Sequence, residues 1–219
     1  MNKYALFKFF LVGITMLVVS FLNAQSNWVL KRDQDGIKVY TGSQTNSSIK
    51  AVKVECVFNA TPPQLAAVIF DINTNDQWVY RSKNYRVVKK INPFDLYYYA
   101  EIETPWPVSN RDFIAHLKIS QNLHQKTWVI ITENEPDLVP EVKDVVRIRE
   151  CKGKWVITQQ GLNTVKAEYT LFTDPGGNVP AWLINLFITE GPIESFKKLK
   201  EQIKKPAYAN IVIPGTGNF

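Results

Sequence analysis

Alternating apolar and polar positions dominate the chain between residues 37 and 172, and such alternation is typical of strands that bury one face. Asn92-Pro93 and Lys152-Gly153 are turn signals between the alternating runs. The pattern therefore predicts a meandering antiparallel sheet. Its expected strands cover residues 37–40, 50–58, 85–91, 96–102, 113–119, 128–132, 145–151, 155–158 and 164–172.

Helical signals occur before and after these strands. Thr61, two prolines and Gln64 form a capping box with proline at the first helical position, which predicts a helix through about Asp71 and a short second helix at 73–80. Residues 178–205 carry apolar side chains at helical spacing, with lysines opposite. Gly191-Pro192 interrupts this amphipathic pattern, so either a kinked helix or two consecutive helices is expected.

The first 24 residues have the pattern of a cleaved signal peptide. Lys3 and Lys8 precede an uncharged, mostly apolar stretch at 9–22, which is shorter than the roughly 20 residues of a spanning helix. We predict a signal peptide at 1–24, cleaved after Ala24, and export to the periplasm or the medium. One domain is expected at 25–205, followed by a tail at 206–219 without periodicity.

The charge balance gives little indication of a partner. The chain has 26 Lys and Arg against 20 Asp and Glu, and its one dense basic cluster lies in the predicted terminal helix at 197–205. A solvated helix face is the main interpretation of these lysines, and transient contact with an anionic membrane surface is the alternative. Nucleic-acid binding is not expected, because the aromatic residues alternate into the sheet instead of following a basic stripe.

Most catalytic and metal-binding patterns are missing from the sequence. There are two histidines, no Cys-x-x-Cys, no His-Glu-x-x-His, no Gly-x-Ser-x-Gly and no phosphate-binding glycine loop, so we predict no metal and no cofactor. Glu101 and Glu103 share a strand face but are expected to meet solvent.

Alternation places Cys56 on a core face as a free thiol. A curved sheet closed by one helix can enclose a pocket.

Several spaced motifs resemble the START (StAR-related lipid transfer) domain family, with wording nearest to its phosphatidylcholine-transferring members. They are PWPVSNRDF at 105–113, Phe-Asp-Ile at 70–72 followed by Trp78, Val-Arg at 146–147 followed by Trp155, and DPGGNVPAWLINL at 174–186. The similarity runs from about Trp28 to Ile203.

The resemblance implies an α+β helix-grip fold, in which a strongly curved antiparallel sheet wraps around a long C-terminal helix and encloses a hydrophobic tunnel for one lipid. It also implies binding or transfer of a hydrophobic molecule by a non-catalytic monomer. The alternative is a cyclase-like or hydrolase-like enzyme of the wider helix-grip superfamily. A scaffold whose cavity is filled by its own side chains is a third interpretation.

Every second residue of a strand lies on the same face. This alternation, together with the resemblance, predicts which residues face the ligand. Leu117 and Tyr98 stand where sterol-binding relatives carry an arginine and a glutamate, which favours a neutral or apolar ligand. Glu150 is either a lone carboxylate near the ligand or a strand end in solvent, and the sequence leaves both open. The predicted ligand-binding residues are Tyr98, Phe113, Ala115, Leu117, Val146, Ile148, Glu150 and Tyr169 from the strands and Trp182, Leu186 and Phe187 from the terminal helix.

Arg111 and Asp112 are predicted to be structural anchors. Neighbours on a strand point to opposite sides, so these two side chains cannot readily pair with each other. We expect each to have its own partner, which for Arg111 would be a carboxylate elsewhere in the chain. The acidic, proline-bearing segment 133–144 resembles the family loop beside the tunnel entrance.

Overall fold

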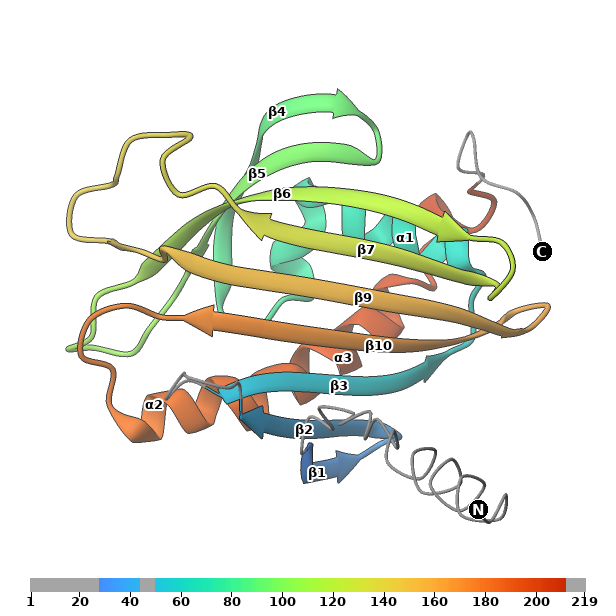
Figure 1. Ribbon diagram of the computed structural model, residues 1–219, viewed down its shortest axis with the longest axis horizontal. Coiled ribbons are helices and arrows are strands. Elements are labelled where there is room, and N and C mark those ends of the chain that lie inside the picture. The colour runs from blue at the N-terminus through green and yellow to red at the C-terminus, as the bar shows by residue number, and fades with distance from the viewer. Residues whose placement is uncertain (1–27, 44–49, 212–219) are drawn as a thin grey trace, which may run out of the picture.

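The computed structural model describes residues 28–43 and 50–211 (Figure 1). The predicted signal peptide and the end of the predicted tail lie outside the described residues. Among the described residues, no helix is both long and apolar enough to cross a membrane. The strands are β1 (Val29–Gln34), β2 (Ile37–Ser43), β3 (Lys50–Phe58), β4 (Ser82–Asn92), β5 (Asp95–Ile102), β6 (Arg111–Asn122), β7 (Thr127–Asn134), β8 (Val146–Arg147), β9 (Glu150–Gly161) and β10 (Thr164–Asp174).

These strands form one sheet, in the order β1-β2-β3-β10-β9-β7-β6-β5-β4. Every pair along this path is antiparallel, as the alternation predicts, and β8 adds a short parallel pairing with β6. The pairing of β3 with β10 joins the two ends of the domain, because these strands are separated by most of the chain. The sheet is curved, and its helices lie on one side (Figure 1).

One predicted strand and one predicted turn are wrong. The run at 145–151 is two elements: β8 ends at Arg147, and β9 begins at Glu150. The predicted turn at Lys152-Gly153 lies inside β9, where Gly153 pairs with Thr132 and Leu171. A Cβ on Gly153 would come within 3.1 Å of the Thr132 side chain, so the glycine allows a close approach instead of a turn.

The first helix follows the predicted capping rules closely. α1 (Pro62–Phe70) begins after Thr61, whose side chain accepts a hydrogen bond from the Gln64 amide, while the Gln64 side chain accepts one from the Thr61 amide. The short second helix is a 3₁₀ segment, η1 (Ile72–Gln77). Both predicted helices are therefore present with shifted ends.

The C-terminal helix is continuous but irregular. α2 (Ala181–Asn185) leads into a π-helical turn, η2 (Leu186–Glu190), and then into α3 (Gly191–Gln202), before a last 3₁₀ turn, η3 (Pro206–Tyr208). Pro192 falls in the first turn of α3, where its missing N–H is tolerated. The sequence predicted either a kink or two consecutive helices at Gly191-Pro192; the helix instead continues through Pro192, and a π turn lies directly before it.

The core lies between the sheet and the helices. Phe196 of α3 stacks on Trp155 of β9, with ring centroids 5.3 Å apart, and contacts Phe58 of β3 at 6.0 Å. Leu199 and Ile193 of the same helix are fully buried in this cluster. The helix is therefore held against the central strands by aromatic packing.

Candidate functional site

The inward face of the sheet contains most of the strand residues that parity predicts. Tyr98, Ala115 and Leu117 are buried in the main core cluster, and Phe113 and Tyr169 pack against it while remaining partly exposed. Tyr98 contacts Phe113 edge to face, with ring centroids 5.6 Å apart. The alternation of β5, β6 and β10 is thus predicted correctly, and these side chains do lie together.

Three tyrosine hydroxyls meet on this face. Burial raises the pKa of Tyr85, Tyr98 and Tyr169, and the neighbouring tyrosine and Cys151 groups raise the pKa values of Tyr98 and Tyr169 further. Burial likewise raises the pKa of the Cys151 thiol to about 11. All four groups therefore stay neutral near pH 7, where they can form hydrogen bonds but carry no charge.

A row of polar side chains crosses the inward face beside these tyrosines, and the sequence analysis missed it. Tyr98 pairs with Ala115, Ala115 with Asn134, and Cys151 with Thr173, so β5, β7, β9 and β10 contribute polar side chains and β6 contributes only Ala115 to this row. Asn134 Oδ1 is buried and has no hydrogen-bond partner among the described residues, and Thr173 Oγ1 is buried beside the thiol of Cys151. Extending the alternation of β7 and β10 by one pair would have found both residues.

Of the two alternatives for Glu150, the structure shows the strand end in solvent and not the carboxylate near the ligand. Its side chain is exposed at the start of β9, and the next residue, Cys151, takes the inward position. The reason is the break between β8 and β9, which ends the alternation on which the prediction rested. Of the other residues in that run, Ile148 is buried, and Val146 is half-buried and lines a pocket at the mouth of the fold.

The helical residues predicted to cover the ligand are only partly placed as expected. Trp182 is 53% exposed, whereas Leu183 beside it is 1% exposed, so the prediction for Trp182 is wrong by one residue. Leu186 and Phe187 are half-buried, and the Phe187 ring contacts Tyr80 at 6.1 Å. The π turn adds a residue to one helical turn and so rotates the preceding segment relative to α3.

The PWPVSNRDF segment forms the turn between β5 and β6. The Asn110 amide group donates to Glu101 Oε1 at 2.7 Å, and its carbonyl oxygen accepts from the Thr104 amide at 3.0 Å. Glu101 also accepts from Asn84 and is 7% exposed, so the expectation that it meets solvent is wrong. Buried hydrogen bonds therefore fix the shape of this turn.

Arg111 and Asp112 point to opposite sides of β6 and have separate partners, as predicted. Asp112 accepts two hydrogen bonds from Arg147, from Nε to Oδ1 at 2.8 Å and from Nη2 to Oδ2 at 3.0 Å. The expected carboxylate partner of Arg111 is wrong: its guanidinium donates to backbone carbonyls of Ser109, Pro175 and Gly176. Arg111 thus links the β5–β6 turn to the segment before α2.

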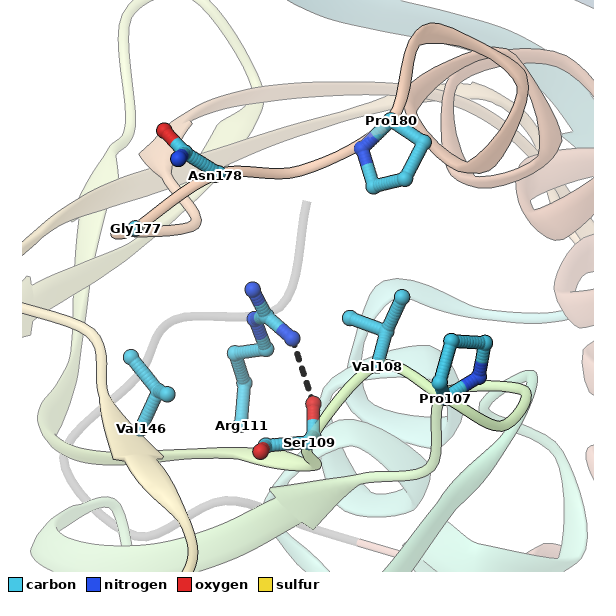
Figure 2. A pocket seen from close by; sticks show the side chains of 8 residues that line it. All are labelled: Pro107, Val108, Ser109, Arg111, Val146, Gly177, Asn178 and Pro180. Carbon is cyan, nitrogen blue, oxygen red and sulfur yellow. Dashed lines mark hydrogen bonds between the residues drawn. The ribbon is translucent and has the colours of Figure 1, made fainter.

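A pocket of about 300 Å³ lies where these two segments meet (Figure 2). The guanidinium of Arg111 points into it from β6. The opposite wall belongs to the segment between β10 and α2. We call it the mouth pocket; its lining residues are Pro107, Val108, Ser109, Arg111, Val146, Gly177, Asn178 and Pro180.

Arginines also organise the acidic loop between β7 and β8. Arg147 donates to the carbonyl oxygens of Pro136, Val139 and Pro140. Arg149 forms exposed ion pairs with Asp137 and Glu141. The loop is therefore held on the buried Arg147–Asp112 pair, and its acidic side chains neutralise a neighbouring arginine.

The basic cluster of the terminal helix is partly neutralised. Lys197 Nζ lies 3.0 Å from Asp35 Oδ2, and Lys200 Nζ donates to the Asp35 carbonyl at 2.8 Å. Lys204 pairs with Glu201. Lys198 is exposed. Among residues 28–43 and 50–211, no group of three or more His, Cys, Asp and Glu side chains is arranged to hold a metal ion.

A curved antiparallel sheet packed around a C-terminal helix, with aromatic side chains between them, defines a helix-grip α+β protein. The START domain model matches residues 15–207, and the chain belongs to the START domain family. This match begins inside the predicted signal peptide, whose cleavage stays a prediction.

Individual relatives agree with this assignment. The chain is 30% identical to the phosphatidylcholine transfer protein of Bos taurus, over 81% of this chain and 83% of the relative. It is 28% identical to an uncharacterized protein of Pseudomonas aeruginosa, over 82% and 88%. The crystal structure of a STAR-related lipid transfer protein from Xanthomonas axonopodis superposes with a TM-score of 0.74 at 29% identity, covering 81% of this chain and 99% of that one.

Proposed function

We propose that this protein binds a single lipid or other hydrophobic molecule between the inward face of the sheet and the C-terminal helix. Two relatives are named as lipid transfer proteins, which supports a lipid ligand. The observation that carries the proposal is the inward face itself. It combines partly exposed apolar rings, such as Phe113, with the side-chain oxygen of Asn134, which is buried and unpaired among the described residues. A fully self-packed core would leave neither.

The ligand we propose is neutral where it meets the sheet. Leu117 and Tyr98 occupy the positions at which the resemblance would put charged side chains, and both are buried on the inward face. The groups that remain are hydroxyls, an amide and a thiol. These can bind an alcohol, ester or carbonyl oxygen, whereas a buried charge would lack a counter-charge there.

A carrier without catalytic chemistry is the interpretation we favour over an enzyme. An acid or base working near pH 7 needs a pKa near that value, and burial moves the pKa values of the inward tyrosines and of Cys151 further away from it. Glu150, for which the sequence left open a position near the ligand, is exposed. A cyclase-like or hydrolase-like activity remains the second candidate.

We further propose that the protein is exported and works as a monomer. These proposals rest on the signal-peptide pattern at 1–24 and on the family resemblance. Transient contact with an anionic membrane would use the exposed lysines of the terminal helix, and no nucleic-acid partner is proposed.

The proposed function is tested by native mass spectrometry and solvent extraction of the protein purified from its own source. A lipid present at one molecule per protein is the expected result. The double variant Tyr98→Phe/Tyr169→Phe keeps both rings and removes two inward hydroxyls, so it should retain less of any ligand with a polar end. Tyr97→Phe is the matched control, because Tyr97 stacks on His116, whose position in β6 falls on the opposite face from Ala115 and Leu117. Repeated recovery of ligand-free protein would contradict the proposal.

A further inference from the structure

Arg111 lies at the mouth pocket, at the start of β6, on the same side of that strand as Phe113 but at the rim of the inward face. The residue is 5% exposed, and its guanidinium points between the β5–β6 turn and the segment before α2 (Figure 2). The volume of about 300 Å³ is at the lower end for small-molecule pockets, so it suits a compact chemical group better than a whole lipid.

The two buried arginines of this region differ in their partners. Arg147 has the carboxylate of Asp112 in a two-point contact. Arg111 has no carboxylate within ion-pairing distance in the part of the chain that the structure describes. Its acceptors are three backbone carbonyls, with distances of 3.3 Å from Nε to Pro175 and from Nη2 to Gly176. Within residues 28–43 and 50–211, Arg111 is therefore a buried positive charge without a counter-ion.

The donors of Arg111 are also not all used. A guanidinium has five N–H groups, and each of the three carbonyl contacts takes one of them. Two N–H groups thus remain without an acceptor among the described residues. Burial lowers the pKa of Arg111, as expected for a charge that its surroundings do not compensate. A bound anion would supply both the missing charge and the missing acceptors.

The walls of the mouth pocket suit such an anion. Asn178 lines the wall across the pocket from Arg111; its exposed side chain is turned away from the guanidinium in Figure 2, and rotation about its Cα–Cβ bond would bring an amide donor toward the pocket. Asp174, the acidic residue closest in sequence to this wall, accepts from the Gly176 amide at 2.8 Å. Val108 and Val146 make other parts of the wall apolar, which strengthens an ionic contact by excluding water.

We propose that the mouth pocket binds a phosphate group, held by the guanidinium of Arg111, with the side-chain amide of Asn178 turning in as a second donor. Arginine presents paired donors that match two phosphate oxygens. A phospholipid headgroup and a free phosphate ester both offer this group. The site goes beyond the proposed hydrophobic ligand, since its residues lie at the rim and it recognises charge.

The test changes the charge of the pocket without touching Arg111. Asn178→Asp has nearly the same shape, is exposed in the native protein, and places a carboxylate opposite the guanidinium. Asn163→Asp makes the same change in the exposed turn between β9 and β10, at the other end of the sheet (Figure 1). The two variants have equal net charge, so any difference between them reports on the pocket.

The probe is inorganic phosphate, titrated at constant ionic strength against chloride while the arginine Nε–Hε signals of the full ¹⁵N-labelled protein are followed by NMR. One arginine signal should shift with saturation in the wild type and in Asn163→Asp. In Asn178→Asp the affinity should fall about ten-fold or more, as expected for a like charge a few ångströms from the site. Dihexanoyl phosphatidylcholine, kept below its critical micelle concentration, is titrated in the same way as the lipid probe.

Each outcome decides the proposal. Saturation by inorganic phosphate supports a site for the free group, and saturation by the short lipid alone supports a headgroup site, provided that Asn178→Asp weakens either one. No saturable shift with either probe, or equal affinities in Asn178→Asp and Asn163→Asp, would overturn it. Such a failure leaves the interior ligand untouched, because that is measured separately by mass spectrometry.

Discussion

Arg147 binds Asp112 through two hydrogen bonds, with the side chain of the arginine 2% exposed and that of the aspartate fully buried. The same guanidinium donates to three carbonyls of the loop between β7 and β8. One ion pair therefore joins the start of β6 to a loop and to β8. Since both charges are out of water, removing either leaves the other uncompensated.

Arg147→Met should lower the free energy of unfolding by about 3–5 kcal/mol, because it leaves Asp112 charged and buried. Arg149→Met is the matched control, as Arg149 forms only exposed pairs with Asp137 and Glu141 and should cost no more than about 1 kcal/mol. Urea unfolding followed by tryptophan fluorescence measures both. Equal losses of unfolding free energy in the two variants would show that the buried pair stabilises the protein no more than the exposed pairs do.

Leu183 is buried and its neighbour Trp182 is exposed, so truncation of Leu183 should cost much more stability than truncation of Trp182. Leu183→Ala creates a cavity at a fully buried position and should cost about 2–5 kcal/mol. Trp182→Ala removes an exposed ring and should change stability by less than about 0.5 kcal/mol. Thermal or urea unfolding of the two variants side by side is the measurement. A larger loss for Trp182→Ala would contradict the helical phase that the π turn sets.

Both cysteines should resist thiol reagents in the native protein. Cys56 and Cys151 are free and buried, and burial raises the pKa of each thiol. Only the thiolate reacts, so Ellman's reagent at about pH 8 should find almost no reactive thiol in the folded protein and two after denaturation. Rapid reaction of either thiol in the folded state would contradict the burial.

The raised pKa of Cys151 also predicts alkaline destabilisation. Its thiol has a pKa of about 11 in the folded protein against 9.0 as the reference value. The unfolded chain therefore loses this proton first as pH rises, so the stabilising contribution is complete below pH 9.0 and is lost progressively toward pH 11. Urea unfolding across this range should show a shallower pH dependence in Cys151→Ala than in the wild type. Identical slopes would contradict the shift.

The exposed Lys198 should contribute to any binding of anionic vesicles. Lys197 and Lys200 already contact Asp35, so Lys198 is the better test of the terminal helix. Lys198→Glu should weaken binding to vesicles with 30% phosphatidylserine by roughly five-fold or more at low salt, at about 1 kcal/mol per charge near the surface. Lys90→Glu, an equal change at an exposed position of β4, is the control. Vesicle binding that is unchanged by Lys198→Glu and by added salt would contradict the membrane proposal.

The correct predictions come from local rules, which relate residues that are close together in the sequence. The capping box at Thr61 was predicted because its partners are three residues apart. Tyr98, Ala115 and Leu117 were placed on the inward face because alternation within one unbroken strand leaves a single choice of side. These predictions need no knowledge of distant residues.

The wrong predictions share a different cause. The inward alternative for Glu150 rested on alternation across 148–149, where the strand is broken, and the prediction for Trp182 rested on a helical period that the π turn changes by one residue. A single inserted or omitted residue reverses a strand face or rotates a helix, and neither event has a clear local signal in this chain. Asn134 and Thr173 were missed because they lie at strand ends that the pattern placed too early.

The sequence by itself thus determined the antiparallel sheet, the family and most of the inward apolar face, since these follow from periodicity and from motifs of adjacent residues. Only the tertiary structure decided the partners of the two charges in PWPVSNRDF. Asp112 receives Arg147 from 35 residues away, and Arg111 meets the carbonyls of Pro175 and Gly176 from across the mouth. Ion pairs and buried carbonyl contacts are fixed by strand register and loop packing, because these bring together groups that no spacing along the chain relates.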